Sequence, residues 1–224
     1  MLRLTAIAVS ALALSLPATA DSLPAVLGRM DQAGPAFRGI TAQFDRVIHT
    51  AIIDDSSTDG GAIRMQRKGK DLRVLLQFTK PEPRSIAFDN KSAQVYNPKI
   101  NTVQIFDLGK QKSLVEQFLL LGFGASGKDL AKAYNIKYLG EENVGKTKAA
   151  RLELIPKSDK VREHYTRIEL WIADGGYPIQ QKLYEPSGNY MRMTYSGIKL
   201  NPPLETAQLS IDLPADVKRE YPQR

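Results

Sequence analysis

The sequence Leu114-Val-Glu-Gln-Phe-Leu-Leu-Leu-Gly-Phe-Gly124 has the length of a short helix followed by a turn, and it is apolar on nearly every side. A helix without a polar face has to be covered all round. The segment is too short to cross a bilayer, which needs roughly 20 residues. It therefore packs against protein, or against something that the protein carries.

The sequence around this segment alternates between apolar and polar residues, which predicts strands with one buried face. The clearest runs of one parity are Leu72, Val74, Leu76 and Phe78; Ile168, Leu170 and Ile172; and Met191, Met193 and Tyr195. We expect strands at 38–53, 62–67, 72–79, 84–88, 93–97, 102–107, 135–140, 148–155, 165–173, 178–185, 189–200 and 207–212. Short connections, including a turn at 54–61, predict an antiparallel meander of about 11 strands.

Helices are few in this sequence. One short helix ends at Gly34-Pro35, and two more are expected at 111–121 and 127–134, the last capped by Ser126 with Asp129 three residues later. Three short helices cannot cover so many strands. The sheet therefore folds on itself as a sandwich or closed barrel, or it curls into an open barrel. The helices would then close the mouth of that barrel over a ligand cavity.

The first 20 residues have the pattern of a secretory signal peptide. Arg3 precedes an apolar run, and Ala18-Thr-Ala20 is a cleavage site, so we expect an exported mature chain of residues 21–224 that forms one domain. The formal net charge is +7, with Lys and Arg spread along the chain, which favours a solvated surface or attraction to anionic membranes over nucleic-acid binding. The sequence has no cysteine, which excludes disulfides, thiol catalysis and a lipid-modified cysteine.

No catalytic or metal-binding motif stands out. The two histidines, His49 and His164, lack the spacing of metal ligands. Gly122, Gly124 and Gly127 match a dinucleotide-binding pattern but follow a helix, where that motif needs a strand. These glycines instead predict a hinge that lets one helix move relative to the next. We expect no enzyme, no cofactor and no metal.

Arg67 shares its strand parity with Ile63 and Met65, so its side chain should point to the apolar side of the sheet. A buried guanidinium needs partners. Two interpretations stay open: an arginine at a strand end that reaches water beside Lys68, or an arginine at the cavity rim that bonds carbonyls of the covering segment.

The order of several loose motifs resembles the LolA family of periplasmic lipoprotein carriers and the related outer-membrane lipoprotein-sorting proteins. The motifs are Ile40-Thr-Ala-Gln-Phe44, Gly61-Ala-Ile-Arg-Met-Gln-Arg67, Leu76-Gln-Phe-Thr-Lys-Pro81, Gln94-Val-Tyr-Asn-Pro98 and Leu209-Ser-Ile-Asp-Leu-Pro214. The resemblance implies an unclosed (half) antiparallel β-barrel with an α-helical lid over a hydrophobic cavity. It also implies that Arg67 holds the lid closed, although Lys68 stands where the family usually has proline.

The resemblance further implies a monomeric periplasmic carrier that takes lipoproteins from an inner-membrane ABC transporter and passes them to an outer-membrane receptor. In that interpretation the lid side chains that compete with cargo are Leu114, Phe118, Leu119, Leu121 and Phe123. The cavity walls are Ile63, Met65, Leu72, Val74, Leu76, Phe78, Leu170, Ile172, Met191 and Met193. An ordinary dry core would use the same residues.

Three other functions remain open. The cargo could be a glycolipid or phospholipid, since acyl chains demand only apolar area. The same fold could serve as a sensor of lipids or lipoproteins. An enzyme acting on a lipid would need polar groups inside the cavity, and strand parity offers mainly Arg67 and Arg46.

Overall fold

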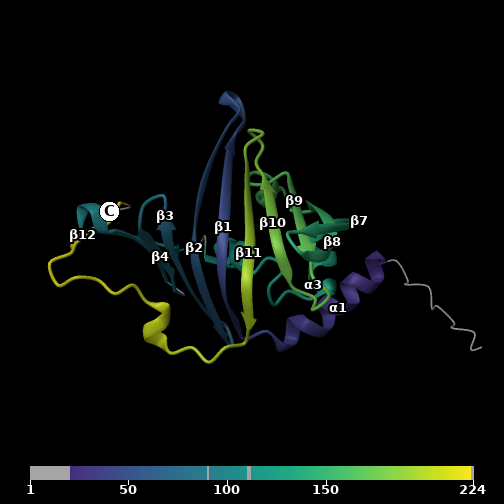
Figure 1. Ribbon diagram of the computed structural model, residues 1–224, viewed down its shortest axis with the longest axis horizontal. Coiled ribbons are helices and arrows are strands. Elements are labelled where there is room, and N and C mark those ends of the chain that lie inside the picture. The colour runs from purple at the N-terminus through teal and green to yellow at the C-terminus, as the bar shows by residue number, and fades with distance from the viewer. Residues whose placement is uncertain (1–20, 90, 110–111, 223–224) are drawn as a thin grey trace, which may run out of the picture.

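A 12-stranded sheet forms most of the structure, a computed structural model that describes residues 21–89, 91–109 and 112–222 (Figure 1). The predicted signal peptide, residues 1–20, lies outside the described residues. Within the described part of the chain, no helix has the length and apolarity that a membrane span requires.

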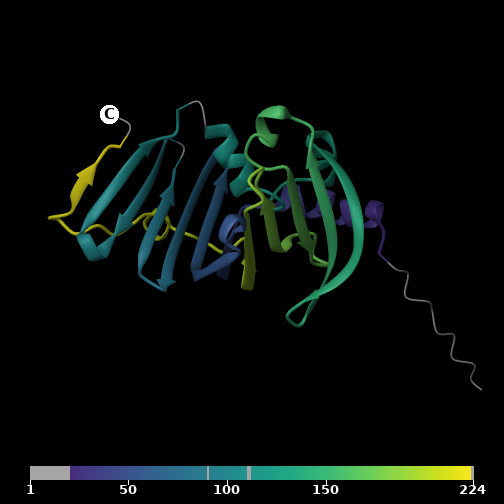
Figure 2. The same cartoon turned by 90° about the horizontal axis from the view of Figure 1, so that it is seen from above.

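The strands form two meanders that meet where β1 pairs with β11, in the order β12-β6-β5-β4-β3-β2-β1-β11-β10-β9-β8-β7. Their bounds are β1 Gly39–Thr50, β2 Asp55–Lys68, β3 Asp71–Lys80, β4 Arg84–Phe88, β5 Ser92–Asn97, β6 Thr102–Asp107, β7 Tyr134–Val144, β8 Thr147–Pro156, β9 Arg167–Ile172, β10 Pro178–Tyr184, β11 Tyr190–Leu200 and β12 Lys218–Glu220. Figure 2 shows that the sheet is curved and open, with β12 and β7 at its two edges. The prediction of an unclosed, mainly antiparallel barrel is confirmed.

The helices are short, as expected. They are α1 Leu23–Ala36, α2 Lys112–Leu119, α3 Gly127–Ala133 and α4 Asp159–Arg162, with 3-10 turns η1 Ala51–Ile53, η2 Pro98–Ile100 and η4 Thr206–Leu209. Seen from above, α2 and the chain that follows it lie inside the curve of the sheet (Figure 2). Ser126 caps α3 as predicted, since its Oγ accepts from the amide of Asp129 at 3.1 Å.

Several predicted boundaries were wrong. The turn expected at 54–61 is narrower, because β2 starts at Asp55 and pairs with β1 up to Thr50 in one long hairpin. Backbone pairing overrides the weak strand propensity of these polar residues. The strand expected at 207–212 is the turn η4, and the twelfth strand is β12, which pairs in parallel with β6. Gly34-Pro35 does not end α1, which continues to Ala36.

The concave face of the sheet carries two core clusters. The first cluster packs α1 and α3 onto β7–β10 and contains Val26, Met30, Leu121, Leu130, Tyr134, Ala150, Leu152, Leu154, Ile168, Leu170, Ile172 and Leu183. The second cluster lies on β1–β3 and contains Phe37, Ile40, Ala42, Phe44, Ile63, Met65, Leu72, Val74, Leu76, Phe78, Phe123 and Tyr195. One short stretch of chain, residues 121–123, therefore contributes to both clusters.

Candidate functional site

Residues 112–126, from α2 to the cap of α3, cover the concave face, and we call them the lid segment. Leu121 and Phe123 are 2% and 1% exposed, and they belong to the first and second clusters respectively. The Phe123 ring lies 6.1 Å from that of Phe37 and meets Tyr195 edge-on at 5.3 Å. Burial raises the pKa of Tyr195 above its ordinary range, so its phenol stays neutral beside the lid.

The C-terminal half of α2 and Leu120, the residue that follows it, also reach both clusters. Phe118 packs edge-on against Tyr165 at 4.6 Å on the first cluster, whereas Leu119 and Leu120 pack on the second. Leu120 was not among the predicted lid residues, although it belongs to the same apolar run. The side chain of Leu114, which was predicted to belong to the lid, lies outside the described residues.

Two of the three predicted hinge glycines have left-handed backbones, with φ of 77° at Gly122 and 70° at Gly124. A Cβ atom on Gly124 would lie 2.6 Å from a ring carbon of Phe37, so both backbone angle and space require glycine there. Gly127 is different. It lies inside α3, where a Cβ would lie 2.5 Å from the carbonyl oxygen of Leu27, so it allows α3 to pack closely on α1.

Among the described residues, two side-chain hydrogen bonds reach the backbone of the lid segment from the sheet. The buried Gln181 on β10 donates to the carbonyl of Leu121 at 2.7 Å. Arg67 donates from Nη1 to the carbonyl of Gly124 at 3.5 Å, and from Nε to that of Gly69 at 3.4 Å. Both arginine distances are at the outer limit for hydrogen bonds. Arg67 therefore lies on the apolar side that its strand parity indicated and contacts the lid segment, and its gating role stays a prediction.

Gln181 was missed by the sequence analysis. The signal was available, because Gln181 has the strand parity of the buried Leu183, and its pairing with Leu170 of β9 places it on the concave face. An amide on an apolar sheet face needs a buried partner.

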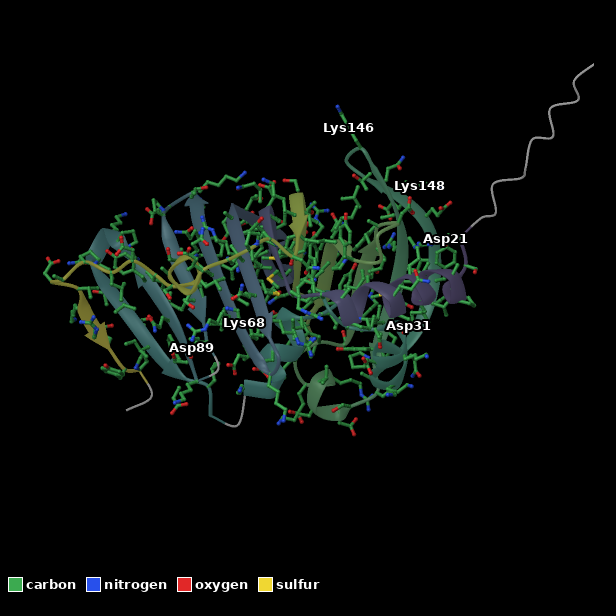
Figure 3. The ribbon with its side chains drawn as sticks, turned by 90° about the horizontal axis from the view of Figure 1, so that it is seen from below. Asp21, Asp31, Lys68, Asp89, Lys146 and Lys148 are labelled. Atoms are coloured by element: carbon green, nitrogen blue, oxygen red, sulfur yellow. The ribbon has the colours of Figure 1, made fainter. Side chains whose placement is uncertain are left out.

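A cavity of about 520 Å³ opens beside the Arg67–Gly124 contact. Its lining residues are Gly34, Pro35, Phe37, Arg38, Arg67, Gly69, Gly124, Ser126 and Asp129. Figure 3 views the molecule from this end. It shows Lys68 at the end of β2, and it shows that α1, which carries Asp31, lies across the other half of the sheet. A second cavity of about 190 Å³ also touches Phe37, Gly122 and Gly124. The lid segment is therefore bordered by open space at its glycine turn.

The ten predicted wall residues all lie in or against the two concave clusters. Ile63, Met65, Leu72, Val74, Leu76 and Phe78 are buried in the second cluster, with Met193 packed against it. Leu170 and Ile172 are buried in the first, with Met191 packed against it. Their contact with a ligand stays a prediction.

Comparison with known proteins gives a family and a fold. A family model described as "Outer membrane lipoprotein carrier protein LolA" matches residues 36–212. Among solved structures, MucB is 16% identical with a TM-score of 0.54, over 88% of this chain and 64% of that one. An uncharacterized conserved protein from Thermus thermophilus is 15% identical with a TM-score of 0.54, over 90% and 99% of the two chains.

The lipoprotein LppX of Mycobacterium tuberculosis is 12% identical with a TM-score of 0.50, over 82% of this chain and 99% of that one. Identities this low show a shared fold alone. This chain spans about two thirds of the length of MucB, at 64%. No curated protein matches the sequence.

Proposed function

Because this chain belongs to the LolA family, we propose that it is a carrier that shields the acyl chains of lipoproteins and moves them from the inner to the outer membrane. One observation carries the proposal. The lid segment buries Leu121 and Phe123 in the concave face. Among the described residues, the sheet side chains that hydrogen-bond to the backbone of the lid segment are Gln181 and Arg67. Such side chains occupy apolar space that an acyl chain can take over.

The energies are compatible with loading and release. An acyl chain of about 16 carbons gains roughly 12 kcal/mol on leaving water, at ~0.8 kcal/mol per CH₂. Exposing Leu121 and Phe123 would cost about 1.5–3 kcal/mol each. Cargo binding therefore stays favourable but weaker than it would be in an open groove. A carrier needs this reduction, since it has to give up its cargo to the next membrane.

The remaining parts of the proposal follow from the family. Residues 1–20 would direct export, and the mature chain from Asp21 would act in the periplasm as one domain. An inner-membrane ABC transporter would load it, and an outer-membrane receptor would accept the cargo. The half-buried Met191 and Met193 suit a wall that adapts to different chains.

The first experiment identifies what the protein carries. The full chain is expressed with its signal, isolated gently from the periplasm, and its bound molecules are analysed by mass spectrometry. Acylated lipoproteins support the proposal. If glycolipid or phospholipid is found without acylated protein, the cargo is a free lipid and not a lipoprotein. A protein that carries nothing and binds no apolar dye would refute a carrier.

A variant tests the role of the lid. Phe118→Asp places a carboxylate where the lid meets Tyr165, so it should abolish uptake of a fluorescent fatty acid while the circular dichroism spectrum stays unchanged. Ile100→Asp is the matched control, because it adds the same charge at a side chain that is 64% exposed. Unchanged uptake by Phe118→Asp would contradict the lid assignment.

A further inference from the structure

Charged side chains gather on the concave face, on the side of the β1–β2 hairpin and away from Arg67. Arg46 has the strand parity of the buried Phe44, and Asp59 that of the buried Ile63. Arg84 is paired with Phe78 across β3 and β4. All three side chains therefore share the surface that carries the second core cluster.

Their geometry is that of two arginines around one carboxylate. Arg46 donates to Asp59 from Nε at 2.9 Å and from Nη2 at 2.5 Å. Arg84 donates from Nη2 to the same carboxylate at 2.6 Å. Both guanidinium groups also lie over the ring of Phe78, at 4.8 Å and 4.1 Å from its centroid. Each of the two cations thus makes a cation–π contact with the same ring.

The cluster has an excess of positive charge. Two arginines face one carboxylate, and guanidinium groups together offer more N–H donors than one carboxylate can accept. Arg84 Nε is buried and has no acceptor among the described residues. The Arg84 side chain is 39% exposed, compared with 16% for Arg46 and 13% for Asp59, so solvent reaches the cluster from the Arg84 side. A second anion can approach the exposed part of the Arg84 side chain from there.

We propose that Arg46 and Arg84 bind the anionic head, a carboxylate or phosphate, of an amphiphile whose acyl chain lies along the concave face. This inference rests on the proposed carrier function and specifies the head of its cargo. Asp59 then acts as an internal acceptor, which holds the two arginines in place and competes with the head.

The dimensions of the face fit one acyl chain. The apolar parity of β3 runs from Phe78, under the arginines, to Leu72, opposite Arg67. Six residue steps along a strand span about 20 Å. The hydrocarbon core of a bilayer is ~30 Å thick, so the acyl chains of one leaflet span about 15 Å. A head at the arginines therefore leaves its tail in the second cluster, where Phe123 now packs.

An ion-pair cluster with a purely structural role makes a different prediction for Asp59. In that case Asp59→Asn would weaken the protein and its binding of every ligand, since two cations lose their partner. If Asp59 instead competes with a bound head, Asp59→Asn should strengthen binding of anionic amphiphiles and leave neutral ones unchanged.

The experiment compares dansyl-labelled undecanoic acid with its methyl ester, which has the same tail and a neutral head. Binding is followed by fluorescence at a pH where the acid is ionised. We expect the wild-type protein to bind the acid about tenfold more tightly than the ester, as charge-assisted hydrogen bonds allow. Arg46→Gln and Arg84→Gln should each remove this preference, so that each variant binds the acid and the ester equally. Asp59→Asn should widen it about tenfold.

Arg73→Gln is the matched control, because Arg73 is exposed on the opposite face of β3 and its loss changes the net charge equally. It should keep the preference for the acid. Circular dichroism and thermal melting establish that each variant folds, and the half-exposed Arg84 makes its variant the safest of the set.

Each other outcome has a definite meaning. Equal binding of acid and ester by the wild-type protein would overturn the head site and leave the apolar carrier intact. Failure to bind either would refute the carrier itself. If inorganic phosphate displaces the dansyl-labelled acid as effectively as unlabelled undecanoic acid does, the site binds free anions, and a site for an amphiphile is overturned.

Discussion

Replacing Phe123 with alanine distinguishes a displaceable lid from an ordinary core. A displaceable lid predicts that ligand affinity rises in the variant, whereas an ordinary core predicts that it falls. Phe123 is 1% exposed and packs against the rings of Phe37 and Tyr195. Truncation of a buried phenylalanine costs about 3–5 kcal/mol of the free energy of unfolding. Urea unfolding of the ligand-free protein should show a loss in this range.

Ligand affinity should rise in the same variant. If cargo displaces Phe123 from the second cluster, the complex no longer depends on its full burial. Should the complex lose only half of a ~3 kcal/mol contribution, the free energy of binding improves by about 1.5 kcal/mol, which is roughly a tenfold lower Kd. The variant protein would then be less stable but bind more tightly.

The assay is titration with a fluorescent fatty acid, with urea unfolding in its absence and at saturation. Phe44→Ala is the matched control, since Phe44 is 2% exposed in the same cluster but belongs to the sheet wall. It should destabilise the protein without tightening binding. If Phe123→Ala weakens binding, or destabilises the free and saturated protein equally, Phe123 is part of a fixed core and the reasoning fails.

Three further changes test other parts of the lid and the fold. Gly124→Ala should lower the free energy of unfolding by more than about 1 kcal/mol in urea, because its φ is 70°. Arg67→Met should speed entry of an apolar dye in stopped-flow fluorescence. It should lower the free energy of unfolding by less than about 1 kcal/mol, because the hydrogen bond of Arg67 to the lid measures 3.5 Å. The neighbouring Lys68→Met should leave the rate of dye entry unchanged. Asp21→Asn should lower the Tm at neutral pH, because hydrogen bonds from Arg29 lower the pKa of Asp21. That contribution is complete above the unfolded-state pKa of about 4 and is lost as the pH falls through the lower folded-state pKa, so wild type and variant should melt together in acid.

Local patterns were sufficient for much of the fold. Which face of a strand is buried depends on a period of two that any short window displays, so Leu72, Val74, Leu76 and Phe78 were correctly expected on the buried face. The same reasoning oriented Arg67 to the apolar side of the sheet, where the structure places it within 3.5 Å of the carbonyl of Gly124. Gly122 and Gly124 follow the end of α2 and have left-handed backbones, as glycines between two helices often do, and their role as a hinge stays a prediction.

Contacts between distant segments could not be predicted in this way. The pairing of β1 with β11 joins residues about 150 positions apart in the chain, and no local period encodes it. The same holds for the parallel pairing of β12 with β6. Arg46 was recognised as an inward-pointing arginine, but its shared acceptor Asp59 and its neighbour Arg84 become visible only once three strands are in register.

If the protein carries acyl chains as proposed, the contacts on the two halves of the concave face predict the order in which cargo displaces the lid segment. On the first cluster, Leu121 is held by a buried hydrogen bond of 2.7 Å from Gln181. On the second, Phe123 precedes Gly124, whose carbonyl accepts the 3.5 Å bond from Arg67. The weaker contact lies on the side of the second cluster, and Gly122, with its left-handed backbone, lies between Leu121 and Phe123. Cargo should therefore displace Phe123 first while Leu121 keeps its place, which leaves the acyl chain on the β1–β3 wall that leads to Arg46 and Arg84.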